Sequence, residues 1–138
     1  MIAKQIKRTA IAILLGSSFL SNPIANAEIQ TYEGVGEHYM ADETETLEAA
    51  RNQAKLIAER SVLEQIQMYI ASYSDVHNSE LTRDETIAIS AGIMNIKHVS
   101  YSITQDSDDT FIVQSSVTAD VDTDQIPKLI EREVRKRV

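Results

Sequence analysis

Apolar residues recur along one long segment with the period of a helix. From residue 47 to residue 73 they appear every three or four positions, as on the buried face of an amphipathic helix. The first half of this stripe is rich in alanine, so a neighbouring backbone can approach it closely. Asp42 and Glu45 have the spacing of a capping box, which predicts that the helix is capped at Asp42. The stripe consists of Leu47, Ala50, Ala54, Ala58, Val62, Ile66, Tyr69 and Tyr73.

Two later segments, residues 96–104 and 111–121, instead alternate apolar and polar residues, which is the period of a strand. The polar residues 105–110 between them indicate a turn, so the two segments are predicted to form a β-hairpin. We expect the apolar side of the hairpin to face the core. The polar side is a candidate interaction surface formed by His98, Ser100, Ser102, Gln114, Ser116 and Thr118.

The remaining segments complete an α+β order. Residues 29–39 are predicted to form a strand, in which Gly34 and Gly36 indicate either a bulge or an element packed close to the backbone. Thr82 with Glu85 predicts a capped second helix, and Pro127 suits the first turn of a last helix. The predicted order is β-α-α-β-β-α. We expect a small three-stranded, mainly antiparallel sheet with the long helix packed on one face.

The first 27 residues have the features of a secretory signal peptide. Basic residues precede a short apolar run at residues 10–20, and small residues follow at Ala25 and Ala27. The run is shorter than the ~20 residues that span a bilayer. We expect cleavage after Ala27, no membrane span after cleavage, a single domain at residues 28–138, and a periplasmic or secreted location.

The expected mature chain is strongly acidic. The whole sequence has a net charge of −8 from 13 basic and 21 acidic residues, and three of the basic residues precede residue 28. Ten basic against 21 acidic residues leave a net charge of −11. Such a surface repels phosphates, which argues against nucleic acid as a partner. The chain has no cysteine, which excludes thiolate metal sites, disulfides and cysteine catalysis.

Acidic residues at the end of the last predicted strand have part of the spacing of a calcium loop. Such a loop needs a glycine at its sixth position, where this chain has Gln125, and Pro127 stands where the loop must curl. Helix capping by an aspartate is the simpler interpretation. A calcium or polar-ligand site stays an alternative, with candidate ligands Asp106, Asp108, Asp109, Asp120, Asp122 and Asp124.

Other candidate chemistry is sparse, and we expect neither a cofactor nor an enzyme. The glycine pair at residues 34–36 lacks the third glycine of a phosphate loop. Three histidines, His38, His77 and His98, are dispersed, and only the first and last could become neighbours if their strands paired. No serine stands in a nucleophile-elbow motif.

Two sequence segments carry a family resemblance. YEGVGEHY at residues 32–39, followed by EAARNQAKLIAERSVLEQI at residues 48–66, resembles the N-terminal domain of the flagellar T-ring protein and related small envelope lipoproteins. The resemblance covers residues 28–124 and implies an exported α+β domain that assembles with envelope structures. This sequence has no cysteine for lipidation. We therefore expect a non-enzymatic envelope protein whose partner is another envelope protein or itself.

Overall fold

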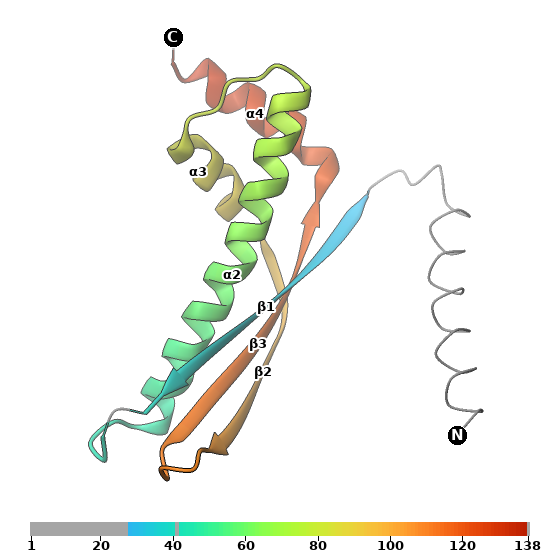
Figure 1. Ribbon diagram of the computed structural model, residues 1–138. Coiled ribbons are helices and arrows are strands. Elements are labelled where there is room, and N and C mark those ends of the chain that lie inside the picture. Colours follow the sequence, from blue (N-terminus) through green and yellow to red (C-terminus); the bar gives the residue numbers. More distant parts are fainter. Residues whose placement is uncertain (1–27, 41, 138) are drawn as a thin grey trace, which may run out of the picture.

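The protein is an open three-stranded antiparallel sheet with helices, in the α+β class and the element order that the sequence predicts (Figure 1). The computed structural model describes residues 28–40 and 42–137, so the predicted signal peptide lies outside the described residues. The elements are β1 (Ile29–Tyr39), α2 (Leu47–Val76), α3 (Arg83–Ile93), β2 (Asn95–Gln105), β3 (Phe111–Asp122), the short 3-10 helix η1 (Thr123–Gln125) and α4 (Ile126–Arg135).

The strand order in the sheet is β1-β3-β2, so the last strand in sequence is the central one. β3 pairs with β1 from end to end in one unbroken register, and with β2 through the hairpin. A register irregularity lies in β2, between Ile96 and His98. Both β1 and β2 are therefore edge strands.

The long helix α2 lies across one face of this sheet, mainly over β1 and β3 (Figure 1). Its buried positions follow the predicted stripe from Ala50 to Ile66, whereas Leu47, the first residue of the stripe, is 38% exposed. They continue to Ile70 and Ser74 in place of the tyrosines, which are half-buried. The helix is closest to β1 at the two glycines. A Cβ on Gly36 would lie 2.5 Å from the Ala58 backbone nitrogen. Close packing, not a bulge, is thus the reason for glycine here.

The start of α2 is a correction to the sequence prediction. Thr46 caps the helix, since its Oγ1 accepts a hydrogen bond from the Ala49 backbone N–H at 3.1 Å. The Asp42 carboxylate instead accepts hydrogen bonds from the backbone N–H groups of Thr44 and Glu45. Asp42 therefore stabilises a turn ahead of the helix, because an aspartate can bond its own local backbone in place of a helix end.

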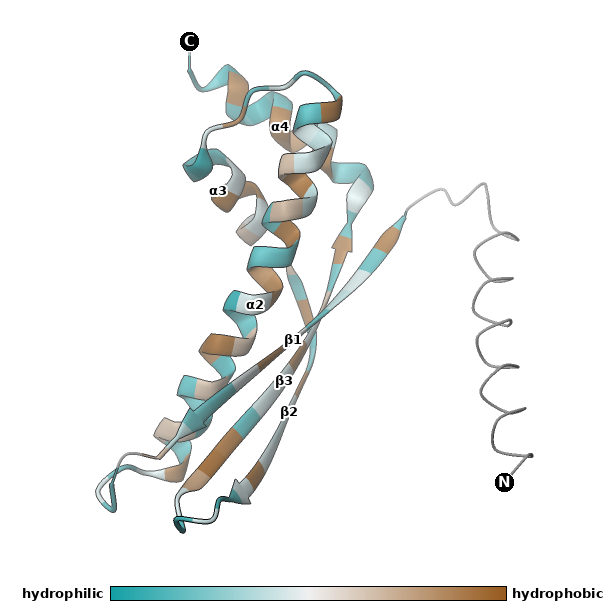
Figure 2. Ribbon diagram, in the orientation of Figure 1, coloured by the Kyte–Doolittle hydropathy of each residue, from teal (hydrophilic) through white to brown (hydrophobic). Residues whose placement is uncertain are grey.

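The second half of α2, α3 and α4 form the larger part of the core at one end of the sheet (Figure 2). Thr82 and Glu85 make the predicted capping box at the start of α3. Pro127 lies in the first turn of α4, as the sequence predicts. The fully or nearly fully buried residues of this core include Ile66, Ile70, Ile89, Ile93, Val117, Val121, Ile126 and Ile130.

An ion pair joins the end of the described chain to the start of α3. The Arg137 side chain donates to both carboxylate oxygens of Glu85, with Nε 3.0 Å from Oε2. The backbone N–H of Thr82 also donates to Glu85. Hydrogen bonds from Arg137 and then from Thr82 lower the pKa of Glu85 from 4.5 to about 2. This contribution to stability is complete above pH 4.5 and is lost as the pH falls through 2.

The Arg137→Ala variant should raise the pKa of Glu85 back toward 4.5, because its largest cause of lowering is removed. The loss of stability between pH 4.5 and pH 2 should also become smaller. A side-chain carboxyl titration by NMR measures the first effect, and denaturant unfolding at the two pH values measures the second. Arg135→Ala is the control, because Arg135 pairs with Glu131 and should leave Glu85 unchanged.

The hairpin is as predicted, but its burial is not. Val113, Val117 and their neighbours of the same parity in β3 are buried under α2. The helix α2 does not cover the equivalent face of β2, so Tyr101 stays 40% exposed and Ile103 stays 42% exposed. The expectation that the apolar side of the whole hairpin faces the core is therefore wrong for β2, because one helix covers only two strands.

Candidate interaction surface

The face of the sheet opposite α2 brings polar residues from all three strands together. We call it the polar sheet face. It includes all six residues that the sequence singles out, and β1 adds three more. Directly opposed residues in antiparallel strands lie side by side on the same face. The three rows across β1, β3 and β2 are Glu33–Thr118–His98, Val35–Ser116–Ser100 and Glu37–Gln114–Ser102.

Hydrogen bonds order the acidic side of the polar sheet face. Gln114 Nε2 donates to Glu37 Oε1 at 3.1 Å, and Ser116 Oγ donates to Glu33 Oε1 at 3.0 Å. Both bonds draw β1 carboxylates toward the central strand. The charge thus changes across the face, from two carboxylates on β1, through amide and hydroxyl groups, to hydroxyls and His98 on β2. Such a surface offers hydrogen-bond donors and acceptors to a partner.

Glu33, Val35 and Glu37 are functional candidates that the sequence reasoning did not select. Their common parity in β1 is visible in the sequence, but which strand neighbours β1 is not. Because β3 lies between β1 and β2, the side of β1 opposite the buried glycines is continuous with the polar side of the hairpin. The sequence does carry a signal for these three residues. The residues of β1 alternate between its two sides, and Gly34 and Gly36 mark the side that faces the helix.

The aspartates at the end of β3 mainly shape the chain. Asp122 accepts from the backbone N–H of Asp124 at 3.1 Å and from the Gln125 side chain at 3.2 Å, so it caps η1. Asp120 accepts from Thr31 Oγ1 at 2.7 Å. Asp120 and Asp122 do line one hollow at this end of the sheet, but Lys97 lines it too. A neighbouring ammonium group disfavours a cation there.

The aspartates of the hairpin turn have a similar local role. Asp106 Oδ1 accepts from the backbone N–H groups of Asp108 and Thr110, each at 2.9 Å. Asp109 has a φ of 61°, a left-handed conformation that aspartate tolerates. Across residues 28–40 and 42–137, no three His, Asp or Glu side chains are grouped so that they could hold a metal ion.

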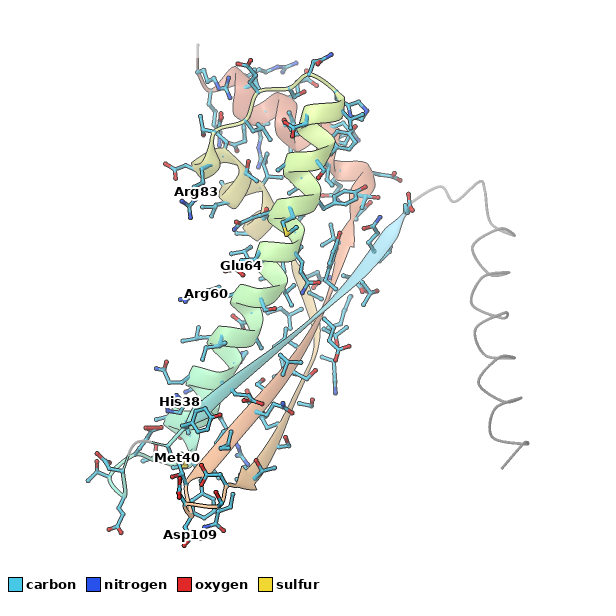
Figure 3. All side chains as sticks on the ribbon, in the orientation of Figure 1. His38, Met40, Arg60, Glu64, Arg83 and Asp109 are labelled. Atoms are coloured by element: carbon cyan, nitrogen blue, oxygen red, sulfur yellow. The ribbon has the colours of Figure 1, made fainter. Side chains whose placement is uncertain are left out.

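The histidines occupy separate places. His38 lies near the end of β1, beside α2 and away from the polar sheet face (Figure 3). Its Nε2 is 2.5 Å from Glu45 Oε1. His98 is on β2, and β3 separates the two strands. His77 stacks on Tyr73 at the end of α2. The strand order therefore keeps His38 and His98 apart.

Comparisons with known proteins assign no family or function to this chain. No protein-family model, curated protein or solved structure matches this chain. In the part of the chain that the structure describes, no helix combines the length and the apolar character needed to cross a membrane. The polar sheet face and the uncovered strand β2 are the exposed features of the described residues from which a function can be proposed.

Proposed function

We propose that this chain is an exported, non-enzymatic envelope protein that acts by binding another envelope protein or itself. The polar sheet face is the contact surface in this proposal. Its partner would meet a flat array of hydroxyl, amide and carboxylate groups, which suits protein–protein contact better than the enclosure of a small molecule.

The observation that carries the proposal is that the helices within residues 42–137 all leave this face uncovered. α2 lies on the other face, and α3 and α4 pack at one end. Of the nine residues, seven are exposed, including Val35 at 48%. An antiparallel sheet often has one wet face, so exposure alone does not indicate binding. On this face the exposed Val35, between two glutamates, adds an apolar component. Exposed Tyr101 and Ile103 add another along the edge strand β2, on its helix side.

Sequence features support the location. The pattern of residues 1–27 favours export, and the net charge of −11 from residue 28 onward disfavours nucleic acid and anionic lipid. The resemblance to the N-terminal domain of the flagellar T-ring protein and to small envelope lipoproteins also favours assembly in the envelope.

The test is crosslinking in living cells with a tagged full-length chain, followed by mass spectrometry of what is captured. We expect one envelope protein, or the chain itself, to dominate. The same spectra should give a mature N-terminus at Glu28. A matched strain carries Ser100→Arg and Ser116→Arg, which place two large charged side chains in the middle row of the polar sheet face.

The two changes should abolish most of the capture without changing the amount of chain in the cell. If neither the parent chain nor the variant captures a specific protein, the proposed function is wrong. Capture that is the same for both would contradict the assignment to this face.

A further inference from the structure

The edge strand β2 is the least covered element of the sheet. Ten of its eleven residues are exposed, and Val99 is half-buried. Arg51 of α2 reaches over it, with its guanidinium carbon 5.7 Å from the centre of the Tyr101 ring. Unpaired backbone groups along an edge strand are a template for another strand. Exposed Tyr101 and Ile103 beside that edge make pairing more favourable, because pairing buries apolar surface.

The other edge of the sheet is protected. Gln65 of α2 donates its side-chain N–H to the backbone carbonyl of Glu33 in β1, at 2.8 Å. β1 also carries Glu33 and Glu37, so two copies of β1 would bring like charges together. In contrast, β2 contains neither aspartate nor glutamate, although the chain has 21 acidic residues. The sheet is therefore open to growth at β2.

The charges on β2 and in the turn after it are complementary to those of a second, antiparallel copy. Lys97 and His98 lie near the start of the strand, and Asp106, Asp108 and Asp109 form the turn directly after its end. When two β2 strands run antiparallel, the start of one lies beside the end of the other. Each copy then places its Lys97 near the acidic turn of its partner, and two-fold symmetry makes this attraction occur twice.

We propose that two copies of this chain pair antiparallel along β2, about a two-fold axis at which Ser102 lies opposite Ser102 of the second copy, to form one six-stranded sheet. This inference rests on the proposed function, names the partner as a second copy, and places the contact along β2, where Ser100 and Ser102 form the edge of the polar sheet face. With faces kept in register, Val99, Tyr101 and Ile103 of both copies share the helix side. The polar sheet faces of the two copies join into one surface. Because β1 is protected, the assembly closes as a dimer.

The first test uses the absence of cysteine from the chain. Ser102→Cys is introduced into the full-length protein, which is purified and treated with a mild oxidant or a short bis-maleimide. Directly opposed residues at the two-fold axis have Cβ atoms ~4.5–5.5 Å apart. A disulfide needs ~3.5–4.5 Å, which a small local shift provides, and a bis-maleimide spans the full distance. We expect roughly tenfold more crosslinked dimer than from Val35→Cys, a control on the same face but on β1. Equal or absent crosslinking overturns the proposal.

The second test reverses charges. Lys97→Glu should raise the dimer Kd roughly tenfold in sedimentation experiments, because two attractions between the copies become two repulsions. Adding Asp108→Lys to the same chain should restore much of the affinity. Lys128→Glu on α4 makes the same charge change away from β2 and should have little effect. Equal weakening by Lys97→Glu and Lys128→Glu, or no rescue, contradicts antiparallel pairing.

These results separate the inference from the function. A chain that stays monomeric when purified, gives no Ser102→Cys dimer, and yet captures a different envelope protein in cells would overturn the self-pairing and leave the proposed function standing. A β2-linked dimer with no capture of itself or another protein in cells would overturn the proposed function.

Discussion

Gly36→Ala should lower the free energy of unfolding by about 3 kcal/mol, at the upper end of the usual range for overpacking. The added methyl carbon would lie 2.5 Å from the Ala58 backbone nitrogen, and closer still to the Ala54 carbonyl oxygen. These are backbone atoms in the middle of a helix, so neither can turn aside as a side chain would. The sheet and α2 must separate, which weakens the packing along β1.

Gly92→Ala is the matched control for this change. A Cβ there meets nothing within 4 Å, and the residue lies within α3. Alanine is favoured over glycine in a helix by roughly 0.5–1 kcal/mol, so the control should be neutral or slightly stabilising. Chemical denaturation of both variants measures the difference. A Gly36→Ala chain as stable as its parent would show that α2 does not approach β1 as described.

Ala54→Leu should destabilise the protein by ~1–3 kcal/mol, from the other side of the same contact. Ala54 has no exposed surface, and its carbonyl oxygen faces Gly36. A leucine has three more carbon atoms and finds no space between the helix and the sheet. The extra atoms must push the alanine-rich half of α2 away from the strands.

Ala71→Leu tests whether this cost comes from position or from leucine itself. Ala71 is an exposed residue of the same helix, so the added side chain extends into solvent. Helix propensity differs little between the two residues, and the control should melt close to its parent. If both leucine variants lose the same stability, the buried face of α2 has been assigned wrongly.

Local patterns predict the elements well where one force dominates. From Leu47 onward apolar residues recur every three or four positions, because one side of the helix is buried against the sheet. The helix α2 has such a buried face. The helix start was missed because Asp42 and Thr46 both suit a cap. Only the structure shows that the Asp42 carboxylate bonds to Thr44 and Glu45 while Thr46 takes the helix end.

Burial of β2 could not be predicted from its alternation. Val99, Tyr101 and Ile103 have the pattern of a strand with one buried face, and they do share the helix side with buried β3 residues. Whether that side is covered depends on where α2 crosses the sheet. Gly34 and Gly36 let α2 pack closely on β1, so the helix lies mainly over β1 and β3 and leaves most of β2 uncovered. That arrangement depends on the strand order.

The candidate surface was predicted in part for the same reason. Sequence alternation places Ser100 and Ser116 on the polar side of one hairpin, and in the structure they lie directly opposite each other. The contribution of Glu33 and Glu37 requires the pairing of β1 with β3, which joins segments about 80 residues apart. Long-range pairing of this kind leaves no local pattern.

The most direct test of the central claim is position-resolved photo-crosslinking in living cells. A photoreactive residue replaces Ser100 or Ser102 on the polar sheet face, or Met68 on the outer side of α2. Met68 is 71% exposed. If exposure alone determined crosslinking, Met68 would therefore react at least as well as the two sheet positions. We predict one dominant protein adduct from Ser100 and Ser102 and none from Met68. Adducts of equal yield from all three positions, or none from the sheet positions, would contradict the account.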